Sequence, residues 1–134
     1  MKLAKAVKRA KRVYLIGNGG SAANAIHIAQ DLQSIGVKAY HLCDAANISR
    51  IANDHGFEYV FSDQIEALGE EGDLLIALSG SGTSSNILKA IEIAEIKGMA
   101  TFLVTDYLRT MDMQKSEEQQ LVSGHEVMRW LKYK

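Results

Sequence analysis

The stretch from residue 13 to residue 24 reads VYLIGNGGSAAN, and its pattern returns at residues 74–86 as LLIALSGSGTSSN. In both copies an apolar run typical of a buried strand precedes a loop of small residues and then a helix-like segment. When the copies are aligned, Gly20 pairs with Gly82 and Asn24 pairs with Asn86. In a parallel sheet such loops lie at the carboxyl ends of the strands, where helix N-termini direct N–H groups outward. The doubled unit therefore predicts an anion pocket, and the many hydroxyl groups favour the phosphate of a small metabolite.

Strand-like and helix-like segments alternate along the rest of the chain. We expect strands at 13–16, 37–42, 73–78 and 100–104. We expect helices up to about residue 11 and at 21–35, 46–52, 58–68, 84–97 and 116–132. The alternation predicts the α/β class, with a doubly wound, flavodoxin- or Rossmann-like parallel sheet of about four strands flanked by helices. Residues 105–116 show neither the helical nor the strand periodicity, which predicts an irregular connection.

Composition limits the kind of protein. A chain of 134 residues that is 47% hydrophobic is long enough for one domain, residues 1–134. The net charge of −1 argues against a nucleic-acid partner, and the basic N-terminal stretch predicts a solvated amphipathic helix. Cys43 is the only cysteine, which excludes an internal disulfide and favours a reducing compartment. No apolar run approaches the roughly 18 residues of a membrane span. We therefore expect a cytoplasmic protein without a membrane partner.

The first loop also fits a dinucleotide-binding fingerprint. Gly17, Gly19 and Ala22 have the required spacing, and Asp44 at the end of the second expected strand could hold a ribose hydroxyl. A dinucleotide site has no use for a second, hydroxyl-rich loop at the neighbouring strand. We therefore expect no nucleotide cofactor.

Three segments resemble a known family. Residues 17–27 (GNGGSAANAIH), 53–57 (NDHGF) and 72–86 (GDLLIALSGSGTSSN) resemble a sugar isomerase (SIS) domain, and more closely the sedoheptulose 7-phosphate isomerases. The resemblance implies a ketose-aldose isomerase of heptose synthesis for lipopolysaccharide or capsule. It also implies a homotetramer with sites between subunits, and often a zinc ion. The phosphate-binding residues expected here are Asn18, Gly19, Gly20, Ser21, Asn53, Asp54, Ser79, Gly80, Ser81 and Ser84.

Such an isomerisation needs a base, an acid and stabilisation of a developing oxyanion. His27 and Asp31 are four residues apart and share one helix face. Glu117 and His125 are eight apart on the last helix, within about 80° of each other. We expect Asp31 and His125 to be catalytic, and His27, Asp31, Glu117 and His125 to be metal ligands, because two imidazoles and two carboxylates suit zinc or, equally, an acid–base pair. A buried core position for His27, helix capping by Glu117 and a plain surface position for His125 are the structural alternatives.

The chain also departs from the family pattern. Asp31 stands where the isomerases carry a glutamate, Glu117 stands where they carry a glutamine, and the segment before the last helix is shortened. These changes leave a second hypothesis, a non-catalytic SIS module that binds a phosphosugar or serves in regulation or assembly. We expect a homo-oligomer in either case, because the family assembles its site between chains and because Leu32 and Ile35 have little polar cover in the sequence.

Overall fold

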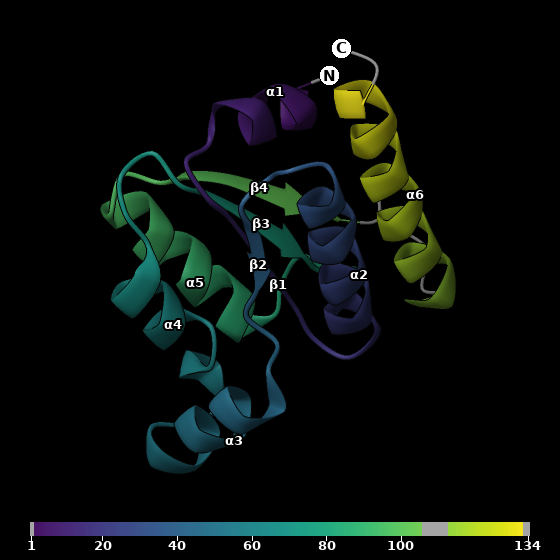
Figure 1. The fold of residues 1–134 in the computed structure, drawn as a ribbon. Helices are drawn as coiled ribbons and strands as arrows, with labels where there is room; N and C mark the ends of the chain where they lie inside the picture. Colours follow the sequence, from purple (N-terminus) through teal and green to yellow (C-terminus); the bar gives the residue numbers. More distant parts are fainter. Residues whose placement is uncertain (1, 106–112, 133–134) are drawn as a thin grey trace.

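A parallel four-stranded sheet lies between two layers of helices in the computed structural model, which describes residues 2–105 and 113–132 (Figure 1). The strands are β1 (Val13–Gly17), β2 (Ala39–His41), β3 (Leu74–Leu78) and β4 (Ala100–Val104), in the order β2-β1-β3-β4. The helices are α1 (Lys2–Arg9), α2 (Gly20–Ser34), α3 (Ala45–Asp54), α4 (Ser62–Leu68), α5 (Ser85–Ile96) and α6 (Met113–Lys132). The predicted α/β fold is confirmed.

The boundaries differ from the prediction in three places. The helix expected at 58–68 is divided into a 3₁₀ turn, η1 (Phe57–Tyr59), and α4, because Val60 and Phe61 between them turn into the core. Strand β2 is shorter than expected, and α6 begins at Met113. Residues 106–112 of the expected irregular connection lie outside the described residues. No described helix is long and apolar enough to cross a membrane.

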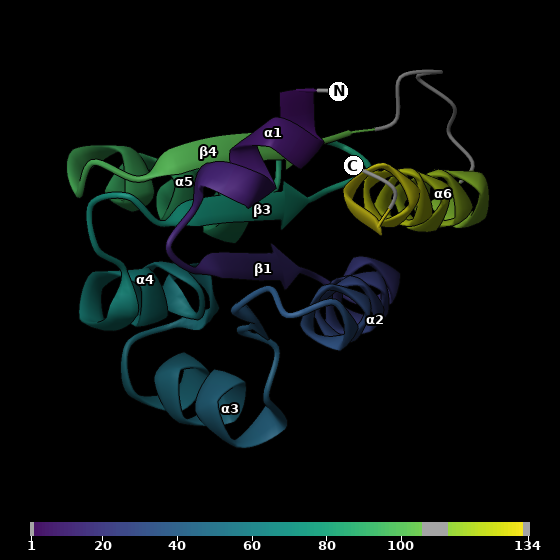
Figure 2. The same cartoon turned by 45° about the horizontal axis from the view of Figure 1, so that its top comes forward.

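Alternation along the strands separates two cores. Side chains such as Val13, Leu15 and Ile76 face α1, α2 and α6, whereas Tyr14 and Leu75 face α3, α4 and α5. Figure 2 shows α2 and α6 side by side near the carboxyl ends of the strands. Leu32 is fully buried in the first core, so it is not available to contact a second chain, and its use as a reason for self-association is wrong. Helix α6 supplies its cover, a tertiary contact that local sequence does not reveal.

The two loops of the doubled unit meet between β1 and β3. The chain runs from β1 outward to β2 and then crosses to β3 on the other side, so the strand order reverses at this point. Asn18 and Asn86 exchange two amide hydrogen bonds there, each of 2.9 Å. The amide pair joins the first loop to the start of α5 and fixes the spacing of the two loops.

Gly17 lets the chain turn directly from β1 into α2. A Cβ atom on this residue would lie 2.7 Å from the backbone carbonyl carbon and oxygen of Ser21. We expect Gly17→Ala to lower the free energy of unfolding by about 1–3 kcal/mol, because backbone must move to admit the methyl group. Urea denaturation measures this change. An unaltered midpoint would show that the turn has more room than the structure gives it.

Candidate active site

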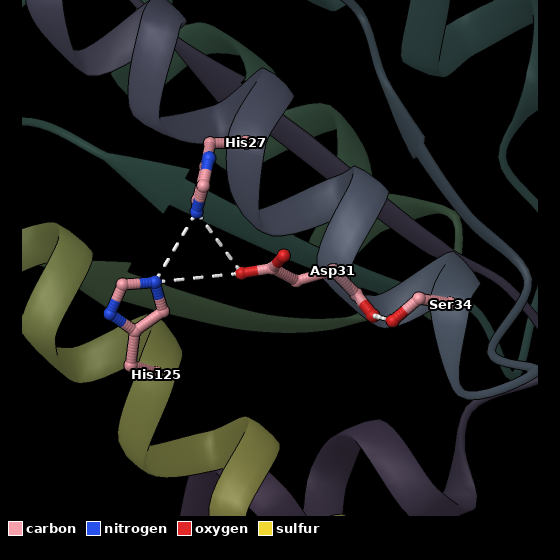
Figure 3. Close-up of polar contacts among 4 residues, drawn as sticks. All are labelled: His27, Asp31, Ser34 and His125. Carbon is pink, nitrogen blue, oxygen red and sulfur yellow. Dashed lines mark hydrogen bonds and ion pairs between the residues drawn. The ribbon is translucent and has the colours of Figure 1, made fainter.

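His27, Asp31 and His125 form a cluster between α2 and α6 (Figure 3). The Nε2 atoms of the two histidines are 3.3 Å apart, and Asp31 Oδ2 lies 3.2 Å from His27 Nε2 and 3.6 Å from His125 Nε2. The exposed fractions of the side chains are 49% for His27, 31% for Asp31 and 46% for His125. Both histidines are therefore open to solvent on one side, and the alternative of His27 as a core residue does not apply.

Two contacts align α6 with α2. Gln120 is 1% exposed, donates from Nε2 to Ser21 Oγ at 3.0 Å, and accepts from Asn24 Nδ2 at 3.1 Å. Further along, Gly124 lies so close to Ile28 that a Cβ atom on it would be 2.6 Å from Ile28 Cγ1. The helices run in the same direction, and the next residue of α6, His125, therefore reaches His27 and Asp31.

The three donor atoms suit a zinc ion. Ligands of a tetrahedral zinc with bonds of about 2.0–2.1 Å lie roughly 3.3–3.5 Å apart, close to the spacing in the cluster. The three atoms also face one another, and a hydrogen bond in each of the three contacts would need one proton per contact. Two imidazoles and one carboxylate carry too few protons on these atoms to make all three hydrogen bonds. A cation placed among them resolves this conflict. Glu117, the fourth expected ligand, lies on α6, but its side chain is outside the described residues.

The second loop folds around its own hydroxyl groups. Ser79 is buried, and its Oγ accepts from the Gly82 N–H at 3.1 Å, while Ser81 Oγ accepts from the Thr83 N–H at 3.2 Å. A hydroxyl that accepts one bond keeps its own O–H to donate. Ser84 is the N-cap of α5 and makes no side-chain capping bond. Ser79 Oγ and Ser81 Oγ, on either side of Gly80, are 3.5 Å apart, so a bond between them would use one of these two O–H groups. The other O–H group and that of Ser84 remain to donate to an anion at the start of α5.

The first loop contributes mainly backbone. Gly19, with φ 55°, is the N-cap of α2, and Gly20 is its first residue, so both lie where N–H groups of the helix start point outward. Asn18 is bonded to Asn86, and Ser21 is 4% exposed beneath Gln120. Ser21 is therefore placed to hold α6 rather than to face solvent.

Asn53 and Asp54 lie apart from the loops. They are exposed at the end of α3, about 13 Å along the helix from its N-cap Asp44, and Asn53 Nδ2 donates to Asp54 Oδ1 at 3.1 Å. Within the described residues, no hydrogen bond joins them to either loop. Within the chain that the structure describes, these two expected phosphate-binding residues are therefore not brought to the loops.

A small apolar pocket of about 210 Å³ opens beside the first loop. The lining includes Gly17, Asn18 and Gly19 on one side and Cys43 and Phe61 on the other. Burial raises the pKa of the Cys43 thiol, so the thiol stays protonated and is a poor nucleophile or metal ligand at neutral pH. The serines of the second loop do not line this pocket.

Three residues of this region were not identified from the sequence: Asn86 as a partner of Asn18, Gln120 and Gly124. A glycine inside a helical pattern is a signal of close packing, so Gly124 beside His125 could have been noticed. A single glutamine carries no such signal, because the sequence does not show which helix faces it.

Comparisons with known proteins agree with this geometry. Residues 1–106 match the model of the SIS domain family. A phosphoheptose isomerase of Serratia proteamaculans is 43% identical over 109 residues, which cover 77% of this chain and 56% of that protein. The chain thus spans little more than half the length of such relatives.

Two solved structures share the fold closely. The phosphoheptose isomerase GmhA from Neisseria gonorrhoeae superposes with a TM-score of 0.90 at 27% identity, covering 98% of this chain and 82% of that one. A phosphoheptose isomerase from Francisella tularensis gives 0.88 at 28% identity, covering 99% and 84%.

Isothermal titration calorimetry tests whether the cluster binds zinc. We expect His27→Ala and His125→Ala each to lower zinc affinity by more than the 10- to 100-fold loss typical of removing a hydrogen-bond partner of a ligand. His55→Ala is the matched control, because His55 is an exposed histidine that pairs with Asp63 elsewhere on the surface. Equal zinc affinity in the unmodified protein and the three variants would contradict the zinc site.

Gly124→Val tests the helix spacing. The side chain would press against Ile28 and move α6 away from α2, so zinc affinity should fall about tenfold or more while the far-ultraviolet circular dichroism stays the same. Arg129→Val adds the same side chain at an exposed position of α6 and should retain zinc binding. A Gly124→Val protein that binds zinc normally would show that the close approach is not required.

Proposed function

The chain belongs to the SIS domain family, and we propose that it is a phosphosugar isomerase that interconverts sedoheptulose 7-phosphate and the corresponding aldose phosphate. The convergence of His27, Asp31 and His125 on one point carries the proposal, because this is the set of groups that proton transfer between adjacent carbons needs. Relatives named phosphoheptose isomerase support a heptose phosphate as the substrate class. The role in heptose synthesis for lipopolysaccharide or capsule stays a prediction. The cytoplasmic location stays a prediction.

In this proposal the loops hold the phosphate. Ser79, Ser81 and Ser84 donate O–H groups, and the N-termini of α2 and α5 add N–H groups and the positive ends of their dipoles. The Asn18–Asn86 pair keeps the two helix starts at a fixed spacing, so the anion meets donors that are already in place. The phosphate thereby orients the rest of the sugar along α2.

The cluster moves the protons. A base removes a proton from C1 of the ketose while O2 gains one, which gives an enediol. A proton then leaves O1 and one is returned to C2, which gives the aldose without net gain or loss of protons. Asp31 is proposed as the base at carbon and His125 as the donor and acceptor at oxygen. In the alternative arrangement, His27, Asp31, His125 and Glu117 would hold a zinc ion instead of transferring protons, and the ion would supply electrostatic stabilisation of the developing oxyanion.

We also propose a homo-oligomer. The cluster is open to solvent on one face, whereas a reaction through an enediol benefits from the exclusion of water. A second copy that covers this face would provide that exclusion, and Asn53 and Asp54 could then reach a neighbouring chain. Light scattering should show a dimer or tetramer at micromolar concentration, and a monomer would contradict this part of the proposal.

Conversion of sedoheptulose 7-phosphate, followed by NMR with and without zinc, tests the reaction. We expect His125→Ala to abolish turnover but retain sugar-phosphate binding, because the loops are untouched. Asp31→Glu should maintain or raise turnover, since one more methylene restores the reach that the family's glutamate has. His55→Ala should behave as the unmodified protein. A protein that binds the sugar phosphate but never converts it would leave the binding module as the function.

Phosphate binding has its own test. Ser81→Ala and Ser84→Ala should each weaken sugar-phosphate binding by about 1–3 kcal/mol, the range for a hydrogen bond to a charged group. Ser49→Ala is the control, because Ser49 is exposed on α3 and its Oγ bonds to Ala46 O. Unchanged affinity in both loop variants would exclude the loops as the phosphate site.

A further inference from the structure

A second cavity lies at the end of the sheet where the strands begin, opposite the end that carries the phosphate loops. It has a volume of about 580 Å³ and is lined by the ends of α1, α2 and α6 together with the residues that precede β1 and β2. Lys11 precedes β1, and Val37 and Lys38 precede β2, whereas the loops follow the carboxyl ends of the strands. The length of strand β1 alone, about 16 Å, separates these two ends of the sheet. The volume is within the 300–1,000 Å³ of ordinary small-molecule sites.

The floor of this cavity is apolar. Val7 is 2% exposed, and Ile35, Val37, Trp130 and Leu131 are half-buried around it. The space beside the floor is open, since a Cβ atom on Gly36 would meet no heavy atom within 4 Å. An occupant therefore gains from burying a flat or aliphatic group here.

The rim of the cavity is positively charged. Lys8, Lys11, Lys38 and Lys132 line it, and the described lining contains no carboxylate. Among the side chains that the structure describes (residues 2–105, 120, 121 and 123–132), the ammonium groups of Lys8, Lys11 and Lys38 have no ion-pair partner. Like charges around one cavity repel one another, so an anion inside it lowers the energy of the lysines without a partner.

Helix capping explains only half of this set. Lys8 and Lys132 lie in the last turns of α1 and α6, where cations are favoured by the helix dipole. The aliphatic carbons of Lys11 lie against Gly72, which precedes β3. Lys38 is in a loop, and no helix end accounts for it. Bulk attraction of polyanions does not account for Lys38 either, because the net charge of the chain is −1.

We propose that this cavity binds a small organic anion with an apolar or aromatic body, at a site separate from the phosphate loops. The apolar floor takes the body of the ligand, and the lysines hold its acidic group. The indole of Trp130 provides a flat surface for an aromatic ring.

The probe for this site is 8-anilinonaphthalene-1-sulfonate, an aromatic anion that fluoresces when buried. Trp130 is the only tryptophan of the chain, so energy transfer from tryptophan to the probe reports binding near this cavity. The test compares the double variant Lys8→Glu/Lys38→Glu, which changes the lining, with the double variant Lys2→Glu/Lys5→Glu, which is the control. Both double variants change the net charge equally, but Lys2 and Lys5 are on α1 outside the lining.

We expect tryptophan-sensitised probe binding to weaken about tenfold or more in the lining variant, because two attractions become repulsions, and to change by less than about twofold in the control. Circular dichroism checks folding, and Lys38→Gln, expected to weaken binding several-fold, replaces the double variant if that protein does not fold. Equal affinity in both double variants would overturn the proposal. So would probe emission without energy transfer, or equally tight binding of uncharged N-phenyl-1-naphthylamine. Loss of the site on self-association would show that a second copy fills it, which also overturns the proposal.

Discussion

The candidate site depends on how closely α6 approaches α2. Gly124 lies against Ile28, and Gln120 is bonded to both Ser21 and Asn24, so α6 is held at one distance and one rotation about its axis. A rotation of α6 by one residue, about 100°, would turn His125 away from α2 altogether. Glycine at this position lowers the intrinsic stability of the helix by about 1 kcal/mol relative to alanine. The packing of the two helices offsets that loss, and the cluster follows from it.

The two loops that we propose as the phosphate site are under a separate constraint. Gly17 allows α2 to start immediately after β1, and the Asn18–Asn86 amide pair ties that start to α5. Each amide in the pair uses one donor and one acceptor on the other, so neither can be replaced by aspartate without losing a bond. The loop positions are thereby set by backbone and amide geometry before any ligand arrives. Such preorganisation reduces the cost of ordering the donors around an anion.

Much of the fold and part of the site could be predicted from the sequence. The strands, the parallel arrangement of the sheet and the two loops were predicted, because each depends on local periodicity and on the doubled unit at residues 13–24 and 74–86. The pairing of His27 with Asp31 follows from helical spacing alone. Gln120, Gly124 and the burial of Leu32 were missed because each depends on which helix faces which, and a pattern of one segment does not contain its partner.

The geometry also bears on the length of the substrate. His27 is seven residues beyond Gly20, a rise of about 10 Å along α2, so the phosphate donors and the cluster are at the two ends of a two-turn segment. A phosphosugar whose reacting carbons are next to its phosphate cannot reach both ends, whereas a sugar with the phosphate on its last carbon can. Asp31 is one turn further along α2 than His27, but its Oδ2 lies 3.2 Å from His27 Nε2, so both side chains act at the same end of this segment. Under the proposed function, the spacing within one chain therefore favours a long ketose phosphate over a three-carbon one.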